Sequence, residues 1–255
     1  MSPLPSTPSF RLDGRRAIVT GASRGIGFAA AAALAEAGAE VVLAARSRDE
    51  LAEKTLALRN RGYAASHLVL DVLDQQAVEK TLSEAGPFDI LVNNAGTNRP
   101  KPMQDVTPED YEAVMGLNVR AAYFVARSVA SEMANAGIRG SIINISSQMG
   151  HVGAAKRTLY CASKFAIEGM TKAMAVEFGP AGIRVNTICP TFILTEMTRP
   201  FLAEPGFEAM VLSKIKLGRL GELEDIMGPV VFLASDASRL VTGASLLVDG
   251  VWTAE

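Results

Sequence analysis

The chain has 255 residues, of which 49% are hydrophobic and 20% are charged, a composition typical of globular proteins with one sizeable core. The formal net charge of −2 argues against a nucleic acid or an anionic membrane surface as the main partner. Two cysteines and two histidines are too few for a disulfide framework or a multi-histidine metal centre, so we expect no bound metal and a reducing, cytoplasmic environment.

The first ten residues contain no apolar stretch, so residues 1–10 are expected to form a mobile tail and not a signal peptide. The alanine-rich stretch over residues 28–45 is interrupted by Glu36 and Glu40, which argues against a membrane span.

Short β-branched runs then alternate with helical patterns. Strands are predicted over residues 17–20, 40–44, 67–70, 89–92, 141–145, 184–188 and 246–248, and helices over residues 28–38, 48–61, 108–136 and 158–178. The strand runs are almost continuously hydrophobic, as in parallel strands covered on both faces. This alternation predicts an α/β fold: one Rossmann-like, doubly wound parallel sheet of about seven strands flanked by helices. No linker divides the chain, so residues 1–255 are expected to form a single domain.

Residues 195–221 interrupt the alternation with a segment rich in Met and Phe that also contains Pro200 and Pro205. Long irregular excursions in compact domains usually have a functional reason. Ligands of open α/β sheets bind beyond the carboxyl ends of the strands, and this segment follows one such end. We therefore expect a mobile lid over the substrate; a pair of packing helices is the alternative.

A glycine-rich turn joins the first predicted strand to the first helix, with glycines at positions 21, 25 and 27. Glycines let the backbone turn tightly and approach a ligand, and the following helix offers free N–H groups to a phosphate. The turn predicts a dinucleotide phosphate site formed by Gly21, Ser23, Arg24, Gly25, Ile26 and Gly27.

The second strand indicates which dinucleotide binds. NAD sites place an acidic residue near its end, whereas here Arg46 and Ser47 follow the strand and no acid precedes Asp49. A guanidinium suits the 2′-phosphate of NADP, and Arg24 could reach the same group. We predict NADP(H); the alternatives are that both arginines are solvated surface charges, or that Asp49 restores some NAD binding.

Tyr160 and Lys164 lie four residues apart on a predicted helix and therefore share one face. A tyrosine of ordinary pKa, about 10, is a poor base at neutral pH, and a nearby ammonium is expected to lower that pKa. Tyr160 is thus a candidate general acid and base that gives a proton to a carbonyl oxygen or takes one from an alcohol. A Tyr-x-x-x-Lys pair on its own also arises by chance.

Further motifs occur in a specific order along the chain: Asp71-Val72, Asn93-Asn94-Ala95-Gly96, Asn118, Ser146-Ser147, Arg184-Val185-Asn186 and Val248-Asp249-Gly250. With the glycine turn and the Tyr–Lys pair, the chain resembles the compact branch of the short-chain dehydrogenase/reductase family over residues 12–252, including its 3-ketoacyl reductase-like and sugar/polyol dehydrogenase-like members. Two departures are Thr191 after Pro190 and Val251 after Gly250, at positions where the family usually has glycine.

The resemblance implies roles for individual residues. Ser147, thirteen residues before Tyr160, would hold the substrate oxygen, and its neighbour Ser146 is the other candidate. Lys164 would hydrogen-bond the nicotinamide ribose, and Asn118 would hold a water that links Lys164 to solvent. Asp71, Val72, Asn93, Ala95, Gly96, Tyr160, Lys164, Pro190 and Thr195 would line the cofactor groove. Asp71 as a turn cap and Asn93 as a tie between strands are the structural alternatives.

The predicted function is NADP(H)-dependent hydride transfer between nicotinamide and a small carbonyl compound or secondary alcohol. A catalytically silent protein that senses NADP(H) on the same fold is the alternative. In the loop over residues 150–157, Lys156 and Arg157 could attract an acidic or phosphorylated substrate, although solvated charges are the simpler interpretation. The resemblance also implies a homotetramer, formed through residues 106–136 and 158–179 with a second contact at residues 244–252.

Overall fold

All seven predicted strands pair in one parallel sheet, in the order β3-β2-β1-β4-β5-β6-β7. The computed structural model describes residues 4–254, so residues 1–3 of the expected tail, and residue 255, lie outside the described part; residues 4–10 carry no helix or strand. The strands are β1 (Arg16–Thr20), β2 (Glu40–Ala45), β3 (Ala65–Val69), β4 (Ile90–Asn93), β5 (Ser141–Ile145), β6 (Arg184–Pro190) and β7 (Ser245–Val248). The predicted fold class is confirmed.

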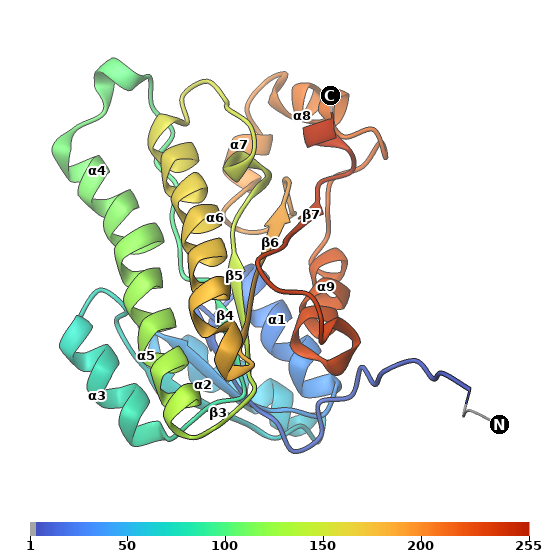
Figure 1. The fold of residues 1–255 in the computed structure, drawn as a ribbon. Helices are drawn as coiled ribbons and strands as arrows, with labels where there is room; N and C mark the ends of the chain where they lie inside the picture. The colour runs from blue at the N-terminus through green and yellow to red at the C-terminus, as the bar shows by residue number, and fades with distance from the viewer. Residues whose placement is uncertain (1–3, 255) are drawn as a thin grey trace.

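Helices cover both faces of this sheet (Figure 1). The α-helices in the two layers are α1 (Gly25–Glu36), α2 (Arg48–Asn60), α3 (Gln75–Ala85), α4 (Pro108–Met115), α5 (Ala122–Asn135), α6 (Thr158–Phe178) and α9 (Glu224–Ala234). Helices α1, α2 and α9 contribute to one apolar core, and α3, α5 and α6 contribute to the other. Short 3-10 turns lie at Met103–Asp105, Gln148–Gly150, Gly179–Ala181, Asp236–Ser238 and Trp252–Ala254.

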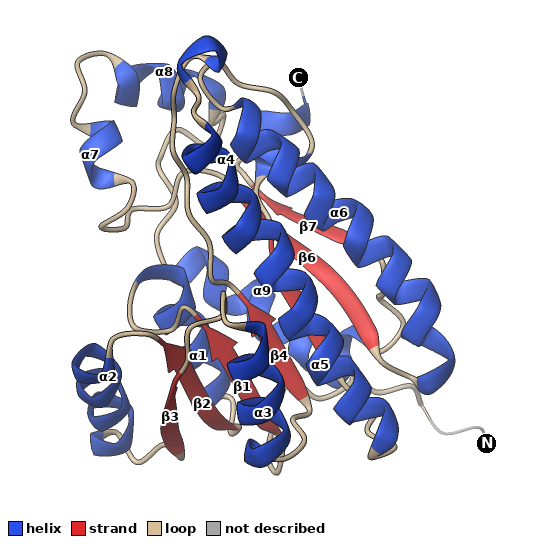
Figure 2. Ribbon diagram, turned by 90° about the vertical axis from the view of Figure 1, so that its left-hand side faces the viewer, coloured by secondary structure: helices blue, strands red, loops and turns tan. Residues whose placement is uncertain are grey.

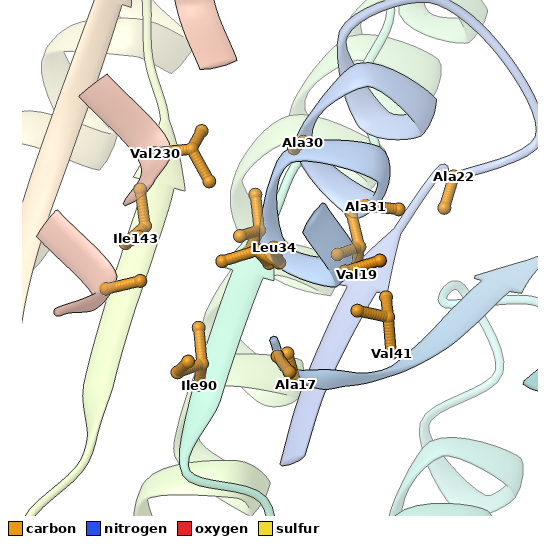
Figure 3. Packing of buried hydrophobic residues seen from close by; sticks show 14 of the residues in the cluster. Ala17, Val19, Ala22, Ala30, Ala31, Leu34, Val41, Ile90, Ile143 and Val230 are labelled. Carbon is orange, nitrogen blue, oxygen red and sulfur yellow. The ribbon is translucent and has the colours of Figure 1, made fainter. Parts of the chain in front are cut away.

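Successive side chains of each strand enter opposite cores because a strand alternates its faces. On β1, Ala17 and Val19 pack in the core below α1, whereas Ile18 packs in the core below α3, α5 and α6. Figure 3 shows the first of these cores, where Ala30 and Ala31 of α1 lie close to the sheet. Burial on both faces explains why the strand sequences show no alternation of polar and apolar residues.

The helix predicted over residues 108–136 is interrupted. A π-helical turn, η2 (Gly116–Ala121), separates α4 from α5 and contains Asn118. Such turns add one residue to a helical turn and often occur at functional sites. The prediction of one continuous helix over residues 108–136 is therefore wrong at this turn, which the hydrophobic pattern did not reveal.

Residues 195–221 contain two short helices, α7 (Arg199–Leu202) and α8 (Phe207–Lys214). The base of this excursion is closed, since Ile193 pairs with Gly221 and the amide of Leu194 donates to the carbonyl of Gly221 at 2.8 Å. In Figure 2, α7 and α8 stand apart from the helices that cover the sheet. Whether the segment moves as a lid stays a prediction.

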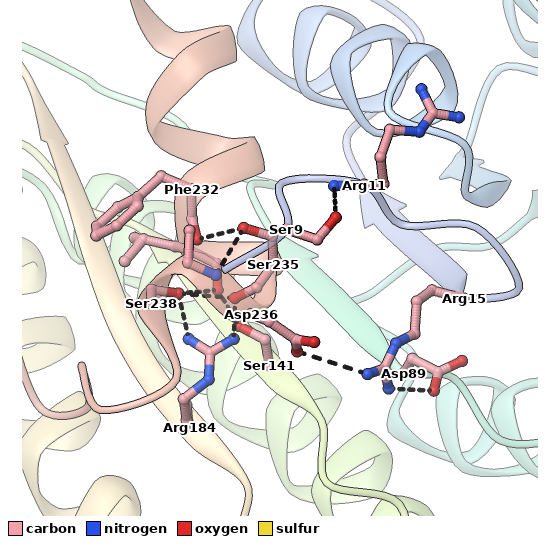
Figure 4. Close-up of polar contacts among 12 residues, drawn as sticks. Ser9, Arg11, Arg15, Asp89, Ser141, Arg184, Phe232, Ser235, Asp236 and Ser238 are labelled. Atoms are coloured by element: carbon pink, nitrogen blue, oxygen red, sulfur yellow. Dashed lines mark hydrogen bonds and ion pairs between the residues drawn. The ribbon is translucent and has the colours of Figure 1, made fainter. Parts of the chain in front are cut away.

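Polar contacts join α9 and the 3-10 turn that follows it to the amino-terminal edge of the sheet (Figure 4). Arg184 of β6 donates to Ser238 Oγ at 2.7 Å, and Ser141 of β5 donates to the carbonyl of Leu233 at 2.8 Å. These contacts stabilise the edge opposite to the site described next. Within residues 4–254, no helix combines the length and the apolar character needed to cross a membrane.

Candidate active site

A cavity of about 510 Å³ opens at the carboxyl ends of the strands. Its lining follows six strands in turn: Gly21 after β1, Arg46 after β2, Asp71 after β3, Asn94 after β4, Ser147 after β5 and Thr191 after β6. Because β1 lies between β2 and β4, the crevice sits at the point where the strand order reverses, which is where ligands bind in open α/β sheets. Every predicted site residue lines this cavity except Asn93 and Asn118.

The glycine turn after β1 has the geometry of a phosphate cradle. Gly21 has a φ of +64°, and a Cβ at Gly27 would lie 2.3 Å from the carbonyl oxygen of Gly21. The side-chain amide of Asn94 holds the turn from the β4 side, donating to the carbonyl of Thr20 at 3.0 Å. Helix α1 starts after Arg24 without a side-chain cap, so its first amides are available to a phosphate. These residues fit the diphosphate of a dinucleotide.

The two arginines predicted to bind the 2′-phosphate, Arg46 and Arg24, differ in their charged neighbours. Arg46 is exposed at the cavity wall and forms no ion pair with any residue in the described range. Arg24 lies 3.5 Å from the carboxylate of Glu196, at the start of the expected lid. Glu50, in the first turn of α2, also lines the cavity, and sequence reasoning had considered only Asp49. Of the two arginines, Arg46 is therefore the one whose charge is not engaged by a carboxylate.

Tyr160 and Lys164 meet the cavity from α6, as their spacing predicts. The Lys164 nitrogen lies 5.5 Å from the centroid of the Tyr160 ring and donates to the carbonyl of Ile145 at 2.9 Å. Ser147 follows β5 on the same cavity wall and lies close enough to Tyr160 to lower the pKa of the phenol. Three of the four predicted catalytic side chains thus come together.

The electrostatics of the pair differ from expectation. Burial raises the pKa of Tyr160, and the nearby Ser147 hydroxyl and the charge of Arg157 lower that pKa by a smaller amount. Burial also lowers the pKa of Lys164 to about 8, against the raising effects of Cys189 and Glu168. The expected lowering of the Tyr160 pKa by Lys164 is therefore wrong for the protein by itself, because desolvation of both groups dominates.

Asn118 and Asn93 lie beneath the cavity lining. Asn118 is 2% exposed; its amide nitrogen donates to the carbonyl of Thr97 at 2.9 Å and to Ser163 Oγ at 3.0 Å. Asn93 donates to the carbonyl of Ala122 at 2.7 Å and to Asn144 Oδ1 at 3.2 Å. Asn118 thus joins the π-helical turn to α6, and Asn93 joins β4 to β5 and the start of α5.

His151 is 28% exposed, does not line the cavity, and contacts the buried polar residues Cys189 and Glu168. Its Nε2 lies 3.4 Å from Cys189 Sγ, and that thiol donates to Glu168 at 3.3 Å. Three possible metal-ligand atoms thus lie within 4.8 Å of one another. Their mutual hydrogen bonds account for the arrangement, and the absence of a bound metal stays a prediction.

One residue that departs from the family pattern contributes a functional group. Thr191 Oγ1 is buried and has no hydrogen-bond partner within residues 4–254, yet Thr191 lines the cavity next to Pro190. A buried hydroxyl without a partner is costly unless a ligand satisfies it. Thr191 therefore fits the polar nicotinamide end of a dinucleotide, and its unusual identity at this position was the available signal. Sequence reasoning also missed Thr97 and Leu117 in the lining.

The fold and the cavity together define a dinucleotide-binding protein of the Rossmann-like class. A family model described as enoyl-(acyl carrier protein) reductase matches residues 21–253. The D-erythrulose reductase of Gallus gallus is 40% identical over 243 residues, which cover 95% of this chain and 97% of that protein. The gluconate 5-dehydrogenase of Gluconobacter oxydans is 40% identical over 94% of this chain and 95% of that protein.

Solved structures agree with these relatives. A gluconate 5-dehydrogenase from Burkholderia cenocepacia, crystallised with NADP and tartrate, superposes with a TM-score of 0.93 and 38% identity, over 96% of this chain and 98% of that one. The chain belongs to the short-chain dehydrogenase/reductase family.

Proposed function

We propose that the protein is an NADP(H)-dependent oxidoreductase that interconverts a carbonyl group and a secondary alcohol on a small sugar or polyol. The observation that carries this proposal is the convergence of Ser147, Tyr160 and Lys164 on the cavity that also holds the glycine turn. The names of the relatives, an erythrulose reductase and gluconate dehydrogenases, support the substrate class. Bound NADP(H) supplies or accepts the hydride.

The proton is handled by the chain's own residues. Tyr160 keeps its proton at neutral pH, because burial raises its pKa, and it donates that proton to the carbonyl oxygen during reduction. Ser147 holds the same oxygen and stabilises the charge that develops on it. Lys164 lies beside the ring, and its ammonium contributes positive charge next to Tyr160. Both amide hydrogens of Asn118 are used by Thr97 and Ser163, so a water serving Lys164 would bind its Oδ1 or its backbone carbonyl.

Selection of NADP(H) rests on Arg46, an exposed guanidinium at the cavity end formed by β2 and α2. Residues 195–198 line the cavity from the other side, which supports a lid role for the segment over residues 195–221. Cys161 and Cys189 are free thiols, as expected in a reducing compartment such as the cytoplasm.

The test combines a substrate panel with one variant. NADPH consumption is measured with ketoses, other ketones and 3-ketoacyl thioesters, and compared with that of Tyr160→Phe. We expect turnover on ketoses and a fall of about 1,000-fold in kcat for the variant. NADPH affinity should change little, because the hydroxyl serves the substrate.

Two results would contradict the proposal. Retained activity of Tyr160→Phe would remove Tyr160 as the acid. Tight NADPH binding without turnover on any compound would favour the silent sensor instead.

A further inference from the structure

Arg157 is the residue just before α6, three positions ahead of Tyr160. Its side chain is half-buried, and its guanidinium carbon lies 5.1 Å from the ring centroid of Phe201 in α7. The guanidinium makes no hydrogen bond or ion pair with any residue from 4 to 254. The neighbouring cation, Lys156, is exposed.

An unpaired guanidinium in this position is unusual on energetic grounds. Arginine carries five N–H donors and a permanent charge, and burial of a charge is costly unless it is paired. Burial lowers the pKa of Arg157, while Tyr160, Cys161 and Glu204 oppose that change. Glu204 acts only through space, since no ion pair joins it to Arg157. The side chain therefore keeps N–H donors that are available to a further acceptor.

The location of Arg157 indicates where that acceptor comes from. Arg157 lies close enough to Tyr160 to lower the pKa of the phenol. Its other neighbour, Phe201, belongs to the segment over residues 195–221, whose first residues line the cavity. Arg157 does not itself line the cavity, but its guanidinium lies between two segments that do: α6, which carries Tyr160, and the segment over residues 195–221.

We propose that Arg157 binds a carboxylate of the substrate, so that the protein acts on a small hydroxy or keto acid of the sugar-acid type in preference to a neutral sugar. The inference rests on the proposed function, because it places the reacting carbon at Tyr160. A planar guanidinium binds a carboxylate through two charge-assisted hydrogen bonds. Phe201 orients the guanidinium plane from one face, leaving its edge for the ligand.

The competing explanation is structural: Arg157 would only pack α7 against α6 through Phe201. The two explanations differ in what removal of the charge does. A packing role predicts equal effects on acidic and neutral substrates, whereas carboxylate binding predicts an effect confined to the acidic ones.

The experiment measures binding to the NADP⁺ complex by calorimetry, with D-gluconate and glucitol as probes. These compounds share a six-carbon hydroxylated chain and differ in whether one end is a carboxylate. The variants are Arg157→Met, which keeps the apolar stem and the contact with Phe201, and Lys156→Met, which removes the adjacent exposed cation. Oxidation kinetics of both compounds provide the second readout.

We expect the wild type to bind gluconate at least about tenfold more tightly than glucitol. Arg157→Met should weaken gluconate binding about 30-fold and glucitol binding less than about twofold. Lys156→Met should change neither by more than about twofold. In the kinetics, the loss should appear mainly in KM for gluconate.

The proposal fails if the wild type does not prefer gluconate, or if Arg157→Met weakens both compounds equally. Its failure is distinguishable from failure of the proposed function, since binding needs no turnover. Charge-dependent gluconate binding without any hydride transfer would retain Arg157 as an anion site and reject the catalytic assignment. Turnover restricted to neutral ketoses would retain the catalytic assignment and reject Arg157 as a carboxylate site.

Discussion

The ammonium of Lys164 lies 5.5 Å from the ring centroid of Tyr160 and is held there by the carbonyl of Ile145, 2.9 Å away. Burial therefore acts on both groups of the pair at once. It raises the pKa of Tyr160 and lowers that of Lys164 to about 8. At neutral pH the tyrosine holds its proton and the lysine its charge, which is the combination that the proposed carbonyl reduction requires.

The pH dependence of reduction follows from these shifts. Below its lowered pKa of about 8, Lys164 is charged, and above that pH it becomes neutral while Tyr160 still holds its proton. We expect kcat/KM for reduction to be level at neutral pH and to fall above pH 8, about tenfold per pH unit. Lys164→Arg is the control, because a guanidinium keeps its charge in this range. A rate that rises above pH 8 would contradict this assignment.

Cofactor preference should depend on Arg46. The substitution Arg46→Asp replaces an exposed guanidinium by a carboxylate that repels a 2′-phosphate and accepts hydrogen bonds from a ribose. We expect the NADPH/NADH ratio of kcat/KM to fall by about 100-fold. Arg24→Ala should have a smaller effect, because Arg24 already lies 3.5 Å from Glu196. A larger effect of Arg24→Ala would show that the glycine turn reads the phosphate.

Val251 adopts a backbone conformation that suits glycine. Its φ is +82°, a region that β-branched residues rarely occupy, and its side chain is 45% exposed. Val251→Gly should raise the free energy of unfolding by about 1 kcal/mol, because it relieves this strain. Urea unfolding at matched protein concentration measures the change. Val69→Gly, at the exposed end of β3, should instead lower the free energy of unfolding by about 1 kcal/mol. If both substitutions destabilise the protein equally, the backbone at Val251 is not strained.

Oligomerisation is expected through the helical layer that contains α4, α5 and α6. Large apolar side chains are exposed on its helices: Tyr111 of α4, Tyr123 of α5, and Phe165 and Val176 of α6. Such a grouping on a folded chain indicates a surface that is covered by a partner. Light scattering should give the mass of four 26.9 kDa chains, and Phe165→Glu should reduce it. A monomeric mass for the wild type would rule out the tetramer.

The parts of this protein that the sequence predicted are those set by local pattern. Helix α6 spans Thr158–Phe178, as its periodicity predicts, and every expected strand is present in the sheet. The glycine spacing predicted the tight turn after β1, because a turn needs only a few neighbouring residues to define its shape. Parallel strands then bring their carboxyl ends together, which explains why most of the predicted residues line one cavity.

Other properties depend on residues far apart in the chain. The bond from Asn118 to Ser163 spans 45 positions and joins a π-helical turn that no periodicity revealed. Lys156 and Arg157 are adjacent cations, yet one is exposed and the other is half-buried against Phe201. The sequence by itself determined the fold and supplied the candidates for the reacting groups, since these follow from local backbone preferences and residue chemistry. Only the tertiary structure decided their pKa values, partners and exposure, because desolvation and hydrogen bonding depend on which distant segments pack against each side chain.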